Sequence, residues 1–355
     1  MMTSAPRGTV RVAISGCGAV TELYYAPTLL ALARKRRIDV VALSDPDGDR
    51  LDTLSAAFPL AAGCSELASV FATQPQLLII ASPPRFHVEQ VLAALAAGID
   101  VLCEKPLAGS CADARRLAEA EATSGRLLSI GMIRRHMPAA RMIRTVLTRE
   151  VLGAITGFEV FEGGPFRWPV HGGGYFDART SGGGVLLDIG AHLLDLLTWW
   201  LGTPANVAAA DDAMGGIEAN ARLTLELDGV PGVIRLSRDW GRPNHVTIRG
   251  AKGSLRWSLE DIDRVTVTLD GDDPLELRAP AGAPATFLDC FRAQLDAVLD
   301  AREGAPAEVV RAAELLPSIG IIETAYRERS LLEMPWLSAN ERAAALHARS
   351  HGAAS

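Results

Sequence analysis

Three ionisable residues interrupt the apolar stretch SGGGVLLDIGAHLLDLLTWW, which occupies residues 181–200. Asp188, His192 and Asp195 are spaced i, i+4 and i+7, so they lie on one face of a helix. Because unpartnered buried charge is costly, this face is expected either to border a site or to hold a structural Asp–His pair. In a site, His192 is suited to accept a proton and a carboxylate to orient its ring, with Asp195 one layer behind.

Lysine is rare in this chain, and its placement singles out one residue. Of 35 basic residues only three are lysines: Lys35, Lys105 and Lys252. Lys105 follows the apolar run DVLCE, and Pro106 disfavours helical geometry at the residue before it, so we expect an extended turn. An ammonium can lose its proton at accessible pH, whereas a guanidinium cannot. Lys105 is therefore either a group that handles a proton or charge at a site, or a simple surface cation.

A glycine pair after the first apolar run indicates a dinucleotide site. In SGCGAVTELYYAP, Gly16 and Gly18 match the first two glycines of G-x-G-x-x-G, and Thr21 stands at the third. The first glycine permits a tight turn. The second lets the backbone approach a pyrophosphate at the N-terminus of the next helix, where Ala19 and Val20 lie.

An aspartate at the end of the next apolar run supports the same site. Asp45, in VVALSDPD, can accept hydrogen bonds from a ribose diol and would repel a 2′-phosphate, which favours NAD over NADP. Arg50 nearby keeps NADP possible. The alternative is a turn aspartate before Pro46.

Two further strand ends are expected at this edge of the sheet. ASPPRFHVEQ breaks its strand at Ser82 and Pro83, where ligands of doubly wound folds bind. His87 begins the following helix and either reaches the cofactor or serves as a capping or packing residue. The next strand brings Glu104 and Lys105 to the same edge, so all five side chains are candidates for the cofactor site.

The glycine-rich segment at 163–184 is expected to contribute to a substrate pocket. Its donors and aromatic rings suit a polyhydroxylated ring and come from Arg167, Trp168, His171, Tyr175 and Arg179. Arg167 also suits a phosphate or carboxylate on the substrate. Loop packing or an oligomer contact is the alternative for these side chains. The glycines are expected at turns and close approaches.

The first part of the chain predicts a doubly wound parallel sheet with α/β alternation. Five apolar runs are expected as strands buried on both faces: 10–15, 39–44, 76–81, 100–104 and 127–131. Stretches between them, such as 86–97 and 111–124, are expected as helices.

The second part predicts a mainly antiparallel sheet with one covered face. Apolar and polar residues alternate between turn signals at 221–227, 233–238, 245–250, 254–259 and 264–269. Helices are expected at 285–302 and 307–328. The expected division is therefore a Rossmann domain at 1–131, a second domain at 132–337, and a tail at 338–355 that is a frayed helix or loose.

Composition limits the partners. The chain has 355 residues, which favours two domains, and 35 basic against 42 acidic residues give a net charge of −7. This balance argues against nucleic acid and anionic membranes. No apolar run reaches the length of a membrane helix, and the N-terminus lacks an apolar signal core. Five scattered cysteines suit a reducing cytosol, so we expect a cytoplasmic protein without a metal site.

The combined motifs resemble the glucose–fructose oxidoreductase/inositol dehydrogenase/MocA (Gfo/Idh/MocA) family. Gly16-x-Gly18, then Glu104-Lys105-Pro106, then GGGVLLDIGAHLLDLLTWWLG follow the family's order, over roughly residues 8–335. IRRHMP resembles the arginine-containing segment that leads into the family's second domain, which makes Arg135 a candidate at the substrate. Departures are Thr21 at the third glycine position and Pro84, where relatives often carry asparagine.

The resemblance implies a Rossmann domain followed by an α/β domain whose large open sheet often forms a dimer or tetramer interface. It implies NAD(P)-dependent hydride transfer on a sugar, cyclitol or related polyol, with catalytic roles for Lys105, Asp188 and His192. His192 places the chain nearer the inositol-dehydrogenase pattern than relatives with tyrosine. Two alternatives stay open: an NAD-dependent glycosidase that oxidises its sugar transiently, and a non-catalytic dinucleotide-binding regulator.

Overall fold

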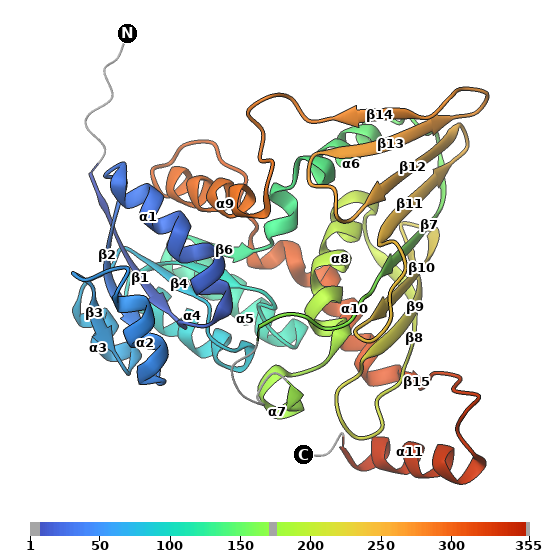
Figure 1. The fold of residues 1–355 in the computed structure, drawn as a ribbon, viewed down its shortest axis with the longest axis horizontal. Coiled ribbons are helices and arrows are strands. Elements are labelled where there is room, and N and C mark those ends of the chain that lie inside the picture. Colours follow the sequence, from blue (N-terminus) through green and yellow to red (C-terminus); the bar gives the residue numbers. More distant parts are fainter. Residues whose placement is uncertain (1–7, 170–175, 353–355) are drawn as a thin grey trace.

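The computed structural model describes residues 8–169 and 176–352 and contains two sheets (Figure 1). The sheet of the N-terminal part lies at the left of Figure 1 and the second sheet at the right. Helices α8 (Val185–Leu201) and α10 (Leu316–Glu328) lie between them. The apolar stretch with the three ionisable residues is therefore α8, at the junction of the two parts.

The first sheet has six parallel strands in the order β3-β2-β1-β4-β5-β6. Their bounds are β1 Val10–Ser15, β2 Ile38–Ser44, β3 Ala62–Cys64, β4 Leu77–Ile80, β5 Asp100–Glu104 and β6 Leu128–Gly131. The doubly wound Rossmann prediction is confirmed. The strand order reverses between β1 and β4, so a ligand crevice is expected at their carboxyl ends. The sequence pattern missed β3, which is only three residues long.

Helices cover this parallel sheet. They are α1 (Ala26–Arg34), α2 (Gly48–Ser55), α3 (Leu67–Ala72), α4 (His87–Ala96) and α5 (Cys111–Ser124). A π-helical turn, η1 (Thr21–Tyr25), precedes α1, and a 3₁₀ turn, η2 (Pro84–Phe86), precedes α4. Asp47 caps α2 by accepting hydrogen bonds from the amides of Asp49 and Arg50, as an aspartate at this position does.

The second sheet has nine strands in the order β14-β13-β12-β11-β7-β10-β9-β8-β15. Their bounds are β7 Ile155–Glu162, β8 Pro204–Asp211, β9 Asn220–Leu227, β10 Val230–Ser237, β11 His245–Gly250, β12 Gly253–Ser258, β13 Arg264–Leu269, β14 Leu275–Arg278 and β15 Ser330–Leu331. Two pairs, β10 with β7 and β15 with β8, are parallel and the other pairs are antiparallel. The prediction of a mainly antiparallel sheet is confirmed.

One face of this sheet carries the core of the second part. Alternate residues such as Leu223, Leu225 and Ile234 are buried, while their neighbours Arg222 and Arg235 are exposed. Helices α8, α10 and α6 (Pro138–Thr148) contact the buried side. The apolar residues of α8 therefore form part of this core, whereas Asp188 and Asp195 pair with residues outside the sheet.

The chain returns to the first sheet after the second is complete. From α9 (Phe287–Arg302), Arg302 Nε lies 2.6 Å from Asp100 Oδ2, and Asp296 pairs with Arg37 of the first part at 2.7 Å. The amide of Ile130 donates to the Val310 carbonyl at 2.9 Å. The expected division at 131–132 separates the two sheets, but segments around α9 and 310–319 pack on the Rossmann core.

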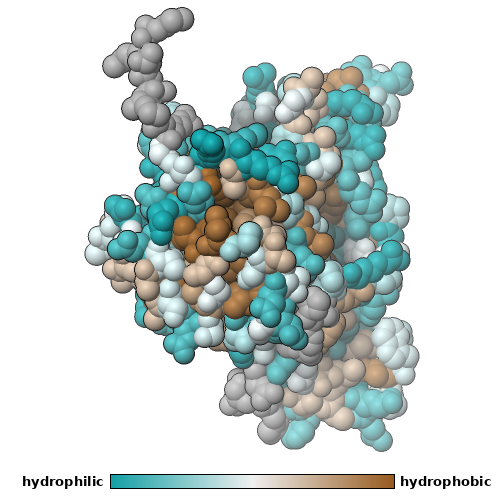
Figure 2. Space-filling model, turned by 60° about the vertical axis from the view of Figure 1, so that its left-hand side comes forward, coloured by the Kyte–Doolittle hydropathy of each residue, from teal (hydrophilic) through white to brown (hydrophobic). Residues whose placement is uncertain are grey.

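The expected tail contains an ordered helix, α11 (Ala339–Gly352), which lies below β15 in Figure 1. Within the described ranges, no helix is long and apolar enough to cross a membrane. In the face drawn in Figure 2, hydrophobic residues gather near the middle and hydrophilic residues surround them.

Candidate active site

A cavity of about 500 Å³ lies where the carboxyl ends of β1, β4 and β5 meet helix α8. Twelve of the residues expected at the site line it: Gly16, Gly18, Ala19, Val20, Asp45, Ser82, Pro83, Glu104, Lys105, Trp168, Asp188 and His192. The structure therefore brings together the glycine turn, the Glu104-Lys105-Pro106 turn and α8.

The glycine turn is shaped by close backbone contacts. Gly16 has φ +99°, and a Cβ there would lie 2.5 Å from backbone atoms of Ala81 and Ser82, so no other residue fits. A Cβ on Gly18 would meet no atom within 4 Å, so the cavity is open beside it. Thr21 is buried, and its hydroxyl donates to the Gly16 carbonyl at 2.6 Å. The threonine at the third glycine position therefore supports the turn.

Asp45 is held by the backbone at the edge of the cavity. Its Oδ2 accepts from the Cys17 amide at 2.8 Å and its Oδ1 from the Asp47 amide at 2.9 Å. Arg50 also lines the cavity and pairs with Asp47 at 3.2 Å. An open glycine turn with a fixed carboxylate beyond it fits the pyrophosphate and adenosine ribose of a dinucleotide.

Lys105 and Asp188 meet across the two parts of the chain. The ammonium donates to Asp188 Oδ1 at 2.5 Å and to the Asp188 carbonyl at 3.2 Å. The guanidinium of Arg238, just after β10, pairs with the other carboxylate oxygen. Burial lowers the pKa of Lys105 to about 8; Glu104 opposes this shift, and Arg134 and Arg238 contribute to it. Lys105 can thus gain or lose a proton near neutral pH, which a surface lysine does not.

His192 lies one helical turn beyond Asp188 and lines the same cavity. Burial, with help from the Lys105 and Arg134 charges, holds the pKa of His192 well below its usual range. Its Nδ1 is buried and has no hydrogen-bond partner among the described residues. A neutral imidazole beside a lysine ammonium is suited to accept a proton from a ligand hydroxyl.

Glu104 supports the lysine turn from behind. Its Oε1 accepts from the buried Tyr25 hydroxyl at 2.6 Å, and its Oε2 accepts from the Lys105 amide at 3.2 Å. Burial raises the pKa of Glu104. The Lys105–Pro106 peptide is cis. Glu104 borders the cavity and fixes the backbone on which Lys105 stands.

The expectation that Arg135 reaches the substrate is not supported. Its guanidinium donates to both Asp195 oxygens, at 2.9 and 2.7 Å, and to Glu314 at 2.7 Å. Arg135 and Asp195 are both buried, and Arg135 does not line the cavity. The preceding residue, Arg134, lines it instead and pairs with Glu162 through two 2.7 Å contacts. The structure also accounts for Asp195, which binds Arg135 behind the site.

His87 is likewise placed behind the cavity. It is fully buried, and its ring nitrogens lie 2.8 Å from the Pro106 and Ser82 carbonyls. Burial lowers the pKa of His87. Of the two readings of this residue, the packing histidine fits these contacts, and it ties the lysine turn to the end of β4.

The 163–184 segment contributes in part. Trp168 lines the cavity, whereas Arg167 is exposed and does not. His171 and Tyr175, also expected at the substrate, lie outside the described residues. The expectation that the glycines before α8 serve close approach is confirmed at Gly184, where a Cβ would overlap the Glu218 carbonyl oxygen.

Sequence reasoning missed several cavity residues. Arg134, Arg238 and an aromatic group of Tyr24, Phe287 and Phe291 were not predicted. Tyr24 stacks on Phe291 with ring centroids 4.7 Å apart and on Trp168 at 6.2 Å. Tyr24 lies in the same segment as the glycine turn, and this proximity could have identified it as a cavity residue. Arg134 lies in the IRRHMP segment, where Arg135 was expected at the substrate instead. Arg238, Phe287 and Phe291 come from distant segments whose local patterns resemble ordinary strand and helix sequence.

The fold and this site together define a nicotinamide-dinucleotide-binding oxidoreductase. A family model described as "Oxidoreductase family, NAD-binding Rossmann fold" matches residues 10–132, and the "GFO/IDH/MocA C-terminal domain" model matches residues 140–256. The chain belongs to the Gfo/Idh/MocA family of oxidoreductases, and its N-terminal domain is an NAD-binding Rossmann domain.

Individual relatives include sugar-acting enzymes. D-glucoside 3-dehydrogenase from Escherichia coli is 32% identical over 206 residues, which is 58% of this chain and 56% of that protein. The chain thus matches about half the length of this curated relative. A 3-ketoreductase from Actinomadura kijaniata in complex with NADP and TDP-benzene superposes with a TM-score of 0.79, at 20% identity, over 92% of this chain and all of that chain.

A levoglucosan dehydrogenase in complex with NADH and levoglucosan also superposes with a TM-score of 0.79. It is 17% identical and covers 90% of this chain and 97% of that chain. At 20% and 17% identity, the ketoreductase and levoglucosan dehydrogenase structures show that the chain shares their fold.

Proposed function

We propose that this chain transfers a hydride between a nicotinamide dinucleotide and a secondary hydroxyl or ketone of a sugar, cyclitol or related polyol. The observation that carries the proposal is the 2.5 Å contact between Lys105 and Asp188, with neutral His192 in the same cavity as the glycine turn. A binding protein has no need for a proton-transfer group and a stabilising cation side by side.

The cofactor's position follows from the Rossmann turn. The open backbone at Gly18 receives the pyrophosphate, and Asp45 receives the adenosine ribose. Ser82, Pro83 and Glu104 also line the cavity, and we assign them to the nicotinamide half of the cofactor. The bound nicotinamide supplies or takes the hydride, and the protein positions the substrate and moves one proton.

The chain's own groups manage that proton. In oxidation His192 accepts the proton of the substrate hydroxyl, and in reduction it returns the proton. The Lys105 ammonium donates a hydrogen bond to the same oxygen and stabilises its developing negative charge. Asp188 holds Lys105 toward the cavity. Acid–base assistance of this kind contributes roughly 10²–10⁴-fold.

The rest of the cavity and the relatives support the proposed substrate class. Trp168 and Tyr24 provide apolar faces, and Arg134 and Arg238 provide donors. Aromatic faces beside charged donors suit the apolar and hydroxyl faces of a sugar ring. The relative at 32% identity is a D-glucoside 3-dehydrogenase, which supports a carbohydrate substrate.

A substrate screen tests the proposal. Inositols, free sugars, sugar phosphates and nucleotide sugars are offered with NAD and with NADP while nicotinamide absorbance is followed. Stoichiometric NADH or NADPH formation is the expected result. Cleavage of a glycoside without net NADH indicates the glycosidase. Tight dinucleotide binding without turnover of any member contradicts the proposal and favours the regulator.

A further inference from the structure

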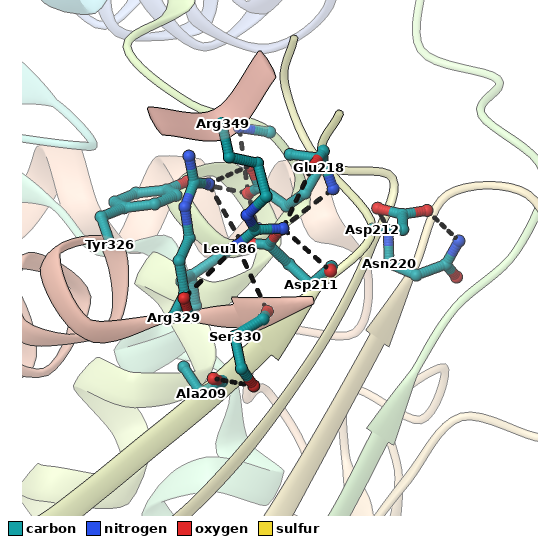
Figure 3. Close-up of polar contacts among 12 residues, drawn as sticks. Leu186, Ala209, Asp211, Asp212, Glu218, Asn220, Tyr326, Arg329, Ser330 and Arg349 are labelled. Carbon is teal, nitrogen blue, oxygen red and sulfur yellow. Dashed lines mark hydrogen bonds and ion pairs between the residues drawn. The ribbon is translucent and has the colours of Figure 1, made fainter. Parts of the chain in front are cut away.

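We infer that Glu218 is a positioning residue for α8, and that the C-terminal helix α11 holds Glu218 in place through an ionic network. The network consists of Glu218, Tyr326, Arg329, Asp211 and Arg349 (Figure 3). The inference extends the proposed function, because α8 carries Asp188 and His192.

Helix α8 has no cap of its own. Its N-cap residue is Gly184, which has no side chain, so the first amides lack an acceptor from their own helix. Glu218 supplies the acceptors from more than thirty residues further along the chain: its Oε1 accepts from the Gly184 and Leu186 amides at 3.1 and 3.0 Å. Its carbonyl accepts from the Val185 amide at 3.0 Å. One residue therefore satisfies three amides at the start of the site helix.

The carboxylate of Glu218 is held through one of its two oxygens. The residue is buried, and the Tyr326 hydroxyl donates to Oε1 at 2.8 Å. Within the described residues Oε2 accepts no hydrogen bond, and Arg329 Nη1 lies 3.8 Å away. Burial raises the pKa of Glu218, opposed by the bonds from Tyr326 and Leu186. A negative charge at this position is favoured by the helix dipole and by Arg329.

The network continues from Arg329 to the end of the chain. Arg329 pairs with Asp211 Oδ2 at 3.0 Å, and Arg349 of α11 pairs with Asp211 Oδ1 at 2.8 Å. Arg349 also donates to the Ala213 and Ser330 carbonyls at 3.0 and 3.2 Å. Asp211 is buried and shared by two guanidiniums. Without Arg349, the Asp211 carboxylate is left to Arg329. We expect Arg329 then to move toward Asp211 and away from Glu218.

The cap lies one turn from the reacting groups. The Asp188 amide donates to the Gly184 carbonyl at 3.1 Å, the first main-chain bond along α8. Asp188 must meet Lys105, which stands on the other part of the chain. A shift of about 1 Å in a catalytic group can cost about 10²-fold in rate. Loosening the first turn of α8 is therefore expected to reduce turnover.

Four variants and hydrogen exchange test the inference without requiring turnover. In Glu218→Ala and Arg349→Ala, amides 184–188 are expected to exchange about tenfold faster, because the capping acceptor is lost or displaced. Glu218→Gln keeps an acceptor oxygen and is expected to exchange more slowly than Glu218→Ala. Arg342→Ala, on the same helix, is the control, since the described residues give its side chain no ion pair.

The kinetic arm uses whichever substrate the screen finds. Arg349→Ala is expected to lower kcat about tenfold with little change in KM for the dinucleotide, because the Gly16–Gly18 turn is untouched. The inference is overturned if amides 184–188 exchange at the same rate in Arg349→Ala as in Arg342→Ala. It is also overturned if Arg349→Ala changes kcat and KM equally. If no substrate is found, the exchange result still decides the role of Glu218, so failure of the proposed function is distinguishable. If Glu218→Ala does not fold, Arg349→Ala carries the test, because α11 contributes only to a small separate apolar cluster.

Discussion

At the residue scale, three groups in the cavity have their protonation set by their surroundings. Burial lowers the pKa of Lys105 to about 8 and that of His192 well below 6.5, while it raises that of Glu104. The site therefore holds a lysine that titrates near neutral pH and a histidine that stays neutral there. In the proposed mechanism His192 is therefore the group that accepts the proton, and Lys105 is the group that stabilises negative charge.

Replacing Lys105 tests its role directly. Lys105→Arg keeps a positive charge but presents a larger, planar guanidinium that cannot reproduce the compact 2.5 Å contact of the ammonium with Asp188. We expect dinucleotide affinity to change less than threefold and kcat to fall at least about 100-fold. Fluorescence titration measures the first quantity and steady-state kinetics the second. Full activity in this variant would contradict the assignment.

The pH profile follows from the same residues. The Lys105 cation is present below its pKa and is lost as the pH rises, so kcat/KM is expected to fall above about pH 8. Burial holds the pKa of His192 well below its usual range, so no acid limb is expected at the pH where an ordinary histidine titrates. A rate that rises through pH 8 would show instead that the neutral amine is the active form.

At the element scale, α8 is held at three levels along its length. Glu218 binds its first turn, Lys105 and Arg238 bind Asp188 one turn later, and Arg135 binds Asp195 further along. Arg135 also binds Glu314, which precedes α10. The two carboxylates that looked anomalous in an apolar helix, Asp188 and Asp195, are therefore paired with other parts of the chain, and His192 between them lines the cavity.

The buried Arg135–Asp195 pair is expected to matter for stability. Asp195→Ala leaves the buried Arg135 guanidinium with Glu314 as its remaining ion-pair partner among the described residues, and we expect it to lower the free energy of unfolding by about 3–5 kcal/mol. The matched variant Glu314→Ala removes a partner whose side chain is 43% exposed and is expected to cost about 1 kcal/mol or less. Urea denaturation measures both. Equal losses would contradict the buried pair.

At the scale of the whole molecule, the second sheet presents an open polar face. Arg222, Arg235, Arg249 and Arg256 are exposed on the strands whose alternate residues form the core. The family resemblance predicts that this face joins two or four copies. Light scattering is expected to give two or four times the chain mass, and Arg235→Glu, at the middle of the sheet, is expected to reduce it. A monomer at micromolar concentration would contradict this prediction.

Much of the fold could be predicted because its signals are local. The apolar runs of β1, β2, β4 and β5 and the period-two strands β9 to β13 each carry their own pattern. Strands β7, β8, β14 and β15 were missed, as was the three-residue β3. Strand β8 is rich in alanine, β14 is largely exposed and β15 has two residues, so none carries a clear apolar period.

The sequence by itself determined the glycine turn, the lysine after β5 and the polar face of α8. Each of these features depends on residue types at short spacings along the chain, which can be recognised without the tertiary structure. Only the tertiary structure decided that Arg134 and not Arg135 lines the cavity, since neighbouring residues on a short 3₁₀ turn point in different directions. It also decided that Arg238 meets Asp188 and that Glu218 caps α8. Those partners are 50 and 34 positions away, and such contacts depend on how sheets and helices pack.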